Sequence, residues 1–245
     1  MKVLIVGSGG REHAIAWSVS KSPKVDKIYC APGNGGIAEL AECVDIAATD
    51  IENMVKFAKD NAIDLVMVAP DDPLVLGMVD AMEKEGIRAF GPRANAAIIE
   101  GSKAFSKELM KKYNIPTANY EVFTDSTSAI DYIKAQNTFP TVIKADGLAL
   151  GKGVIIAQNL EEAEQAVHEM IDDGKFGKSG SRVVIEEFLT GPEVSVLAFT
   201  DGKTVKPMVS AQDHKRAYDN DEGLNTGGMG TFSPSRLYDL SLIHI

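Results

Sequence analysis

The stretch TVIKADGLALGKGVIIA, Thr141–Ala157, decides how the rest of the chain is interpreted. Two apolar runs rich in β-branched residues flank a loop, Asp146–Gly153, that holds three glycines and a lysine. Strand alternation places Val142 and Lys144 on one face, and the residues between and beside them on the other. A lysine inside an apolar strand is costly to bury unless it meets an anion, and glycine lets backbone N–H groups approach a phosphate closely. The stretch fits a phosphate-binding strand and loop, or an ordinary hairpin with a solvated lysine.

Composition narrows the class of protein. The 245 residues suffice for one large domain or two small ones, and 25 basic against 35 acidic residues give a net charge of −10. An acidic chain does not suit nucleic acid or an anionic membrane, so local basic groups must meet any anionic substrate. Cys30 and Cys43 form no metal-ligand pattern, so we expect reduced thiols in a cytoplasmic protein without structural zinc. The first apolar run is too short for a signal peptide, and no run is long enough to span a bilayer.

A glycine turn follows the first expected strand. The run Lys2–Val6 leads into Gly7–His13 and then a helix, an arrangement that suits a phosphate at the positive end of the helix dipole. Arg11 could add a bidentate contact. Glu12 stands where a dinucleotide fingerprint has its third glycine, and the second strand ends in Pro32–Asn34 without an acidic residue. The sequence therefore favours the phosphate of a ligand smaller than NAD.

The alternation of strands and helices continues to residue 90. Strands are expected at 27–31, 64–69 and 88–90, and helices at 51–60 and 74–85, which predicts an open, parallel, Rossmann-like sheet. Ligands bind such sheets beyond the carboxyl ends of the strands, where the loops at Gly7 and Pro70 both lie. Asp71 and Asp72 could orient a hydroxyl or an amine, or simply begin the next helix. A boundary is expected within residues 91–101.

The second half of the chain predicts a small α+β lid. Lys103 begins a helix, where the dipole disfavours a cation and so favours a bound anion. Strand, glycine loop, strand, helix and strand then follow through residue 186. Residues 186–189 could hold an adenine, with Glu193 spaced to reach a ribose hydroxyl, or could form a charged strand end. Gln212–Arg216 and Asn225–Gly230 are interpreted as a basic loop and a glycine nest for an oxyanion, or as a solvated loop and a turn.

Seven motifs in order carry a resemblance to a known family. They are VLIVGSGGREHA, APGNGG, EGSKAF, IKADGLALGKGV, VIEEFLTGPEVS, AQDHKR and NTGGMG. Together they closely resemble the glycinamide ribonucleotide synthetases (phosphoribosylamine–glycine ligases), an ATP-grasp family of purine synthesis, over about residues 1–236. The resemblance implies an α/β chain with a Rossmann-like N-terminal domain at 1–101. An incomplete ATP-grasp domain would follow at 102–245, with a lid at about 120–190.

The resemblance also implies a reaction and its residues. Glycine would join 5-phosphoribosylamine through a glycyl phosphate, with ATP going to ADP and phosphate. Lys144, Asp213 and Lys215 would be catalytic. ATP would meet Lys103, Lys144, Gly147, Gly151, Lys152, Gly153, Glu186, Glu187, Phe188, Leu189 and Glu193. The substrates would meet Gly9, Gly10, Arg11, Asp71, Asp213, Lys215, Asn225, Thr226, Gly227, Gly228 and Met229. The cofactors would be ATP and Mg²⁺ or Mn²⁺, whose family ligands lie beyond residue 245, and the protein would be a cytoplasmic monomer.

The chemistry of such a ligase agrees with these residue types. Phosphoryl transfer needs positioning and cations on the developing charge rather than a protein nucleophile, and no nucleophile–histidine set is visible. Two departures stand out. Ala69–Pro73 replaces the usual Gly-Pro-Glu-Ala-Pro, so the contact of the shorter Asp71 is in question. Residues 240–245 do not resemble the family, so we expect a truncated chain that is inactive or nearly so and exposes apolar surface.

Three other functions compete with this hypothesis. Another ATP-grasp carboxylate–amine ligase would share the Lys144 loop but lack AQDHKR and NTGGMG. The hypothesis of a dinucleotide-dependent oxidoreductase is supported by the Gly7 loop alone. A non-catalytic nucleotide-binding fragment would keep the phosphate contacts without turnover.

Overall fold

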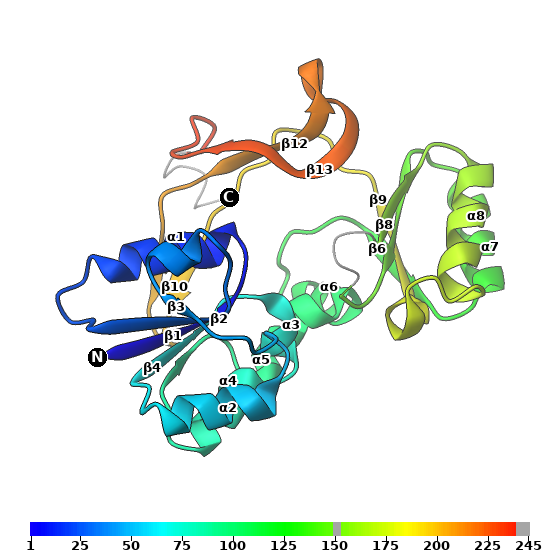
Figure 1. The fold of residues 1–245 in the computed structure, drawn as a ribbon. Helices are drawn as coiled ribbons and strands as arrows, with labels where there is room; N and C mark the ends of the chain where they lie inside the picture. Colours follow the sequence, from blue (N-terminus) through cyan, green and yellow to red (C-terminus); the bar gives the residue numbers. More distant parts are fainter. Residues whose placement is uncertain (149–152, 239–245) are drawn as a thin grey trace. The chain divides into compact units, whose positions relative to one another are not determined.

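The structure is a computed structural model that describes residues 1–148 and 153–238 (Figure 1). Gly151 and Lys152, both expected at the nucleotide, lie outside the described residues. The chain divides into two compact units, Met1–Phe188 and Leu189–Ile245, and each is described by itself. Within the described ranges, no helix combines the length and apolar character needed to cross a membrane.

A five-stranded parallel sheet opens the first unit and confirms the Rossmann-like prediction. Its order is β3-β2-β1-β4-β5, with the first strand of the chain at the centre. The strands are β1 (Lys2–Gly7), β2 (Lys27–Pro32), β3 (Glu42–Cys43), β4 (Leu65–Val68) and β5 (Ala89–Phe90). The central strands are apolar runs because a parallel sheet is covered on both faces.

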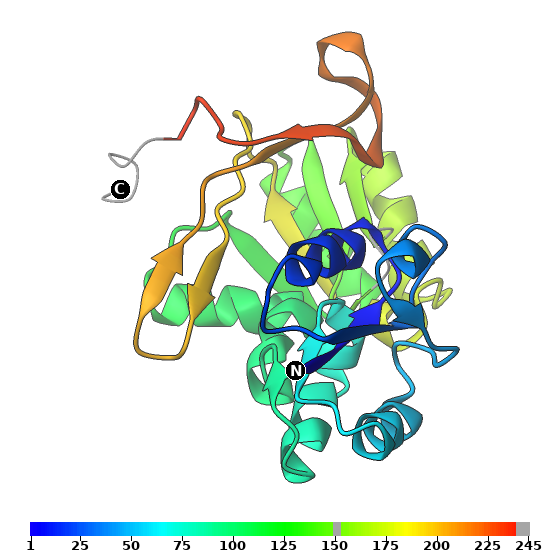
Figure 2. The same ribbon diagram turned by 60° about the vertical axis from the view of Figure 1, so that its left-hand side comes forward.

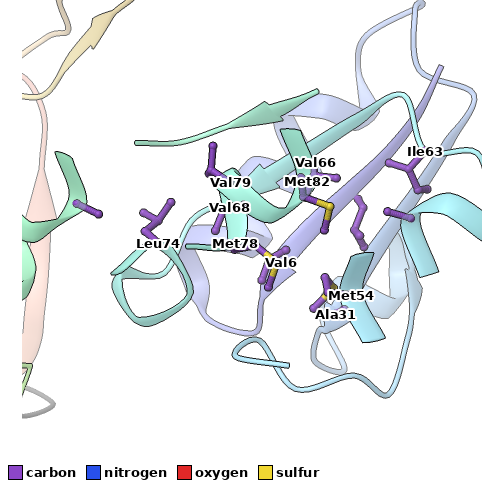
Figure 3. Packing of buried hydrophobic residues seen from close by; sticks show 13 residues of the cluster. Val6, Ala31, Met54, Ile63, Val66, Val68, Leu74, Met78, Val79 and Met82 are labelled. Carbon is purple, nitrogen blue, oxygen red and sulfur yellow. The ribbon is translucent and has the colours of Figure 1, made fainter. Parts of the chain in front are cut away.

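Helices cover both faces of this sheet. Val3 and Ile5 of β1 pack with residues of α1 (Gly10–Ser20) on one face. The alternate residues, Leu4 and Val6, pack on the other face with methionines of α2 (Ile51–Asp60) and α4 (Met78–Lys84). Figure 3 shows Met54, Met78 and Met82 gathered around Val6 in this core. These two cores hold β1 and β4 in place, so the loops that follow the two strands begin at fixed positions.

One sequence expectation in this domain is corrected, and two further elements were not predicted. The single helix expected at 74–85 is two helices, α3 (Asp71–Val75) and α4, because Gly77 at φ +89° takes a conformation that a helix cannot continue through. The expected boundary within residues 91–101 contains a further helix, α5 (Ala94–Gly101). The edge strand β3 was not predicted, since a strand of two residues has no periodic pattern to detect.

The remainder of the first unit is a four-stranded antiparallel sheet with helices on one face. The order is β6-β9-β7-β8, and the strands are β6 (Tyr120–Phe123), β7 (Thr141–Ala145), β8 (Val154–Ala157) and β9 (Val183–Glu187). The helices α7 (Ser126–Gln136) and α8 (Leu160–Ile171) lie side by side against it (Figure 1), and the short η2 (Gly177–Gly180) follows them. Ile143 and Ala145 pack toward these helices, which confirms the predicted alternation and leaves Lys144 on the opposite face.

The second unit consists of two antiparallel hairpins. One joins β10 (Ala198–Thr200) to β11 (Val205–Pro207), drawn in gold in Figure 2. The other joins β12 (Gln212–Tyr218) to β13 (Glu222–Phe232) through η3 (Asp219–Asp221). The loop and the glycine nest predicted here are therefore wrong. The two stretches pair as strands, His214 with Gly230 and Arg216 with Asn225, because backbone pairing needs no side-chain pattern.

Candidate functional site

A cleft of about 740 Å³ lies in the first unit, where the loops after β1 and β4 face the start of α6 (Lys103–Lys112) and the ends of the glycine loop. Its lining comprises Gly7, Ser8, Gly9, Gly10, Arg11, Glu12, Ala48, Pro70, Asp71, Asp72, Glu100, Lys103, Leu148, Gly153 and Val154. The carboxyl ends of parallel strands are where open α/β sheets bind ligands. The cleft is thus the natural candidate for a binding site.

Two groups of predicted residues meet in this cleft. Gly9, Gly10, Arg11 and Asp71, expected at a sugar phosphate, line it together with Lys103 and Gly153, expected at a nucleotide. Asp71 and Asp72 also form the first turn of α3, which confirms that they begin a helix, and their place in the cleft leaves contact with a hydroxyl or an amine as a prediction. Basic and acidic side chains therefore share the wall, which suits a ligand that carries both a phosphate and a hydroxyl or amine.

Glu12 stabilises the glycine turn that follows β1, a role that the sequence did not predict. The buried carboxylate of Glu12 accepts the Gly9 N–H at 2.5 Å. Asn34 donates to the Ser8 carbonyl at 2.8 Å, and Gly33 N–H donates to the Gly7 carbonyl at 3.0 Å. A glutamate three residues after a helix N-cap is the signature that could have identified Glu12. These hydrogen bonds fix the conformation of the turn at the cleft, and the Gly9 N–H is already bonded to Glu12.

Replacing Gly7 by alanine is expected to lower the free energy of unfolding by about 2 kcal/mol. Gly7 lies at φ +126°, and a Cβ there would sit 2.6 Å from Cγ of Glu12. Gly10→Ala is the matched control, because a Cβ at Gly10 meets no described atom within 4 Å and begins a helix. Urea denaturation followed by circular dichroism measures both variants, and equal stability of the two would contradict this account.

Asp146 joins the start of α6 to the four-stranded antiparallel sheet. Its carboxylate accepts the Ala104 N–H at 2.6 Å and the Arg182 Nε–H at 2.9 Å, and the Ser102 hydroxyl at 3.1 Å. Its carbonyl accepts the Lys103 N–H at 3.0 Å. Ser102 caps the helix in turn, with its Oγ accepting the Phe105 N–H. Sequence reasoning treated Asp146 as the first residue of a loop and did not assign it a partner.

Lys103 reaches from the helix start toward the glycine loop. Its ammonium donates to the Gly147 carbonyl at 3.0 Å, and the side chain lines the cleft. Burial lowers the pKa of Lys103 below its ordinary value, although nearby carboxylates oppose the shift. An ammonium held where its charge is disfavoured gains from a bound anion, as predicted from its position at a helix start.

The pH profile of lysine acylation is expected to have a lower midpoint at Lys103 than at Lys59. Desolvation lowers the pKa of Lys103, whereas the hydrogen bond from Lys59 to Glu85 raises the pKa of Lys59. Lys103 therefore loses its proton first as the pH rises, and the neutral amine is the nucleophile. Labelling with acetic anhydride across a pH series, read by peptide mass spectrometry, gives both midpoints. A midpoint at Lys103 equal to or above that of Lys59 would contradict the lowered pKa.

The ammonium of Lys144 pairs with the carboxylate of Glu186. Its position in an apolar strand predicted that it would meet an anion. The two atoms Lys144 Nζ and Glu186 Oε2 lie 2.9 Å apart. The same oxygen lies 3.1 Å from Nζ of Lys107, which also donates to Thr117 Oγ1 at 2.8 Å. The side chains of Glu186 and Lys107 are 5% and 9% exposed, against 27% for Lys144. Lys107 was not predicted, because α6 and β9 are brought together only by the fold.

The residues expected to hold an adenine point in different directions. Neighbouring residues of β9 face opposite sides of the sheet, so Glu187 lies away from Glu186. Glu187 accepts from the Asn119 backbone at 2.8 Å and from its amide at 3.0 Å. Phe188 is partly exposed at the end of the first unit, and Leu189 is exposed at the start of the second.

In the second unit, three predicted side chains lie together. Nζ of Lys215 lies 2.6 Å from Glu193 and 3.6 Å from Asp213, and the hydrogen bond to Glu193 raises the pKa of Lys215. Thr226 donates to the Lys215 carbonyl at 2.9 Å and accepts from Gly228 N–H. Gly227, Gly228 and Met229 are exposed on β13, and the side chain of Asn225 lies outside what the structure describes. Five of the predicted residues of this unit, Glu193, Asp213, Lys215, Thr226 and Gly228, are therefore connected by polar contacts.

The described residues do not form a metal site. Within 1–148 and 153–238, no three His, Cys, Asp or Glu side chains are grouped to hold an ion. Asp71 and Asp72 both line the cleft, but among the residues that the structure describes no third carboxylate is grouped with them to hold an ion. The Mg²⁺ or Mn²⁺ ligands, which the resemblance places beyond residue 245, stay a prediction.

Comparison with known proteins identifies the family. The profile described as "Phosphoribosylglycinamide synthetase, N domain" matches residues 1–100, and "Phosphoribosylglycinamide synthetase, ATP-grasp (A) domain" matches residues 101–243. The phosphoribosylamine–glycine ligase of Halalkalibacterium halodurans is 55% identical over 234 residues, which are 96% of this chain and 54% of the relative. This chain spans about half the length of the curated relatives that it matches.

Solved structures agree. The crystal structure of phosphoribosylamine–glycine ligase from Thermotoga maritima has a TM-score of 0.80 and 33% identity, over 96% of this chain and 56% of that one. The biotin carboxylase domain of Hydrogenobacter thermophilus 2-oxoglutarate carboxylase, 18% identical, shares the fold with a TM-score of 0.76, over 98% of this chain and 55% of that one. The chain therefore belongs to the phosphoribosylglycinamide synthetase family, of which it carries the N domain and an ATP-grasp domain.

Proposed function

We propose that this chain supplies the nucleotide- and sugar-phosphate-binding half of an ATP-dependent ligase that joins glycine to 5-phosphoribosylamine in purine biosynthesis. The observation that carries the proposal is the cleft itself, because the Gly9–Arg11 turn and Lys103 line one continuous wall. The names of the relatives support the substrates. The products would be glycinamide ribonucleotide, ADP and phosphate.

The chemistry proceeds in two steps. A glycine carboxylate oxygen attacks the γ-phosphorus of ATP, the bond to the β,γ-bridging oxygen breaks, and ADP leaves. The amine of 5-phosphoribosylamine then attacks the carbonyl carbon of glycyl phosphate, phosphate leaves with the bonding electrons, and the nitrogen loses a proton. Both steps need orientation and positive charge rather than a protein nucleophile. Lys103 and the loop that begins at Gly147 supply orientation and positive charge to the nucleotide. Arg11 and the Gly10 N–H supply them to the sugar phosphate.

The Lys144–Glu186 pair supports a role for Lys144 at the phosphates. A triphosphate carries more negative charge than a carboxylate, so it competes for the Lys144 ammonium. When Lys144 turns to the nucleotide, Lys107 remains 3.1 Å from Glu186 and keeps that buried carboxylate paired. We assign Asp213, Lys215, Glu193 and residues 225–229 to the substrate and ribose contacts of the same reaction, and Glu186–Leu189 to the adenine.

We further infer that the nucleotide binds as its magnesium or manganese complex, as MgADP does in the 2-oxoglutarate carboxylase structure. A bound divalent ion supplies charge neutralisation at the phosphates. We also propose a cytoplasmic, monomeric protein that takes small-molecule substrates and not nucleic acid, with domains at 1–101 and 102–245 and a lid at about 120–190.

A chimera tests this function. Residues 1–236 of this chain replace the matching part of the Halalkalibacterium halodurans ligase, and ADP and glycinamide ribonucleotide are measured with each substrate omitted in turn. We expect ADP formation that requires both glycine and 5-phosphoribosylamine, and its loss in the Lys144→Ala chimera. ADP formation that is independent of 5-phosphoribosylamine, or that follows another carboxylate or amine, would favour a different ATP-grasp ligase.

A further inference from the structure

The two cysteines of the chain occupy partner positions on neighbouring strands. Cys30 of β2 and Cys43 of β3 are Cα partners in parallel register. Neighbouring strands are about 4.8 Å apart, and residues in register project to the same face. That spacing lies within the range of Cα separations, about 4.4–6.8 Å, that a disulfide tolerates. β3 is an edge strand of two residues, so it can adjust to a covalent link.

Gly33 lies next to both cysteine side chains. A Cβ built at Gly33 would lie 2.4 Å from Sγ of Cys43 and 3.5 Å from Cβ of Cys30. Both cysteine side chains therefore border the same position, and no side chain of residue 33 separates them. This arrangement brings the only two thiols of the sequence within reach of one another.

We propose that Cys30 and Cys43 form a thiol–disulfide modification site that takes a small-molecule disulfide such as oxidised glutathione. The Cys43 thiolate attacks one sulfur of the reagent, a mixed disulfide forms at Cys43, and one reduced glutathione leaves. Cys30 then attacks Sγ of Cys43, the intramolecular disulfide forms, and a second reduced glutathione leaves. The two protein thiols lose two electrons and two protons, and the reagent gains them.

The surroundings of the two thiols set the order of these steps. Cys43 is exposed, whereas Cys30 is fully buried. Burial also raises the pKa of Cys30 to about 12, so its thiolate is scarce at neutral pH. Cys43 is thus the residue that meets the reagent, and Cys30 is the resolving thiol.

Forming the disulfide changes the hydrogen bonds beneath the cleft. In the reduced chain, Cys30 Sγ–H donates to the Gly7 carbonyl at 3.4 Å, and Cys43 Sγ–H donates to the Asn34 carbonyl at 3.6 Å. A disulfide has no S–H donor, so both carbonyls lose a partner. These residues shape the turn at the cleft, because the Asn34 amide holds Ser8. The site therefore couples the thiol state to the glycine turn, whatever ligand the cleft takes.

Oxidation of the folded chain tests the proposal. The chain is incubated with oxidised glutathione, quenched with acid and mapped by mass spectrometry. We expect a peptide pair linked through Cys30 and Cys43, with free thiols falling from two to none and returning on reduction. Cys30→Ser should stop at a glutathione adduct on Cys43, and Cys43→Ser should stay unmodified while folded. Circular dichroism of each variant confirms that the comparison concerns folded protein. A stable glutathione adduct on Cys43 in the unmutated chain, or no reaction there at all, would overturn the proposal.

Amide hydrogen exchange reads the effect on the turn. In the oxidised chain we expect exchange in residues 7–9 and 33–36 to become about fivefold faster, the change that follows the loss of one net hydrogen bond. The amides of α8, remote in the sequence and in a separate core, provide the internal reference. Unchanged exchange in residues 7–9 and 33–36 of a chain shown to be disulfide-linked would refute the coupling.

Discussion

Replacing Asp146 by alanine is expected to lower the free energy of unfolding of the first unit by about 3 kcal/mol. The carboxylate is nearly buried, and its loss leaves the Ala104 N–H and the Ser102 hydroxyl without their acceptor. It also removes the ion pair with Arg182, whose side chain remains 43% exposed and so recovers some hydration. Chemical denaturation of the variant measures the loss directly.

Two further substitutions separate the ion pair from helix capping. Asp125→Ala removes an exposed carboxylate that accepts the Ser128 N–H at the start of α7, and should cost about 1 kcal/mol. Asp146→Asn keeps an acceptor for Ala104 but loses the charge, and should fall between the two alanine variants. Equal losses for Asp146→Ala and Asp125→Ala would mean that Asp146 acts only as a helix cap.

Replacing Glu186 by glutamine is expected to lower the free energy of unfolding by about 3–5 kcal/mol. The change removes the negative charge that Lys107 and Lys144 share, and it leaves the 9% exposed ammonium of Lys107 without its carboxylate. A buried charge that loses its partner is more costly than a pair that is absent altogether. Denaturation monitored at pH 7 measures the effect.

A double-mutant cycle establishes the cause. Adding Lys107→Met to Glu186→Gln should recover part of the lost stability, because it removes the uncompensated ammonium. The matched control is Glu187→Gln, one residue further along β9, whose carboxylate accepts two hydrogen bonds from Asn119; the loss of stability should stay below about 1 kcal/mol. Additive effects of the Lys107 and Glu186 substitutions would show that the two side chains do not interact energetically.

The fold was predictable wherever short-range patterns specify it. The apolar run at residues 2–6 correctly predicted the central strand β1. The alternation around Lys144 correctly predicted which side chains of β7 face the helices and which face away from them. Asp50 and Asn159 are of the residue types that typically cap helices, and both accept backbone N–H groups at the starts of α2 and α8. The break at Gly77 was missed because a single glycine inside a helical pattern is usually tolerated.

The site was predictable as a set of residue types but not as a set of pairs. The sequence indicated that Lys144 needs an anion, yet Glu186 lies on a different strand and becomes its partner only through the register of β7 and β9. Lys107 joins the same carboxylate from a helix. The glycines of β13 look like a nest because their side chains carry no strand signal, whereas their backbone pairing with β12 depends on long-range contacts.

The Asp146 junction determines which parts of the cleft must travel together. Asp146 directly follows β7 and is bonded to the first turn of α6 and to Arg182 just before β9, so a single side chain links these three segments. Lys103 stands in the same first turn and donates to the Gly147 carbonyl, so a change at Asp146 would disturb the position of this lysine and of Gly147 together.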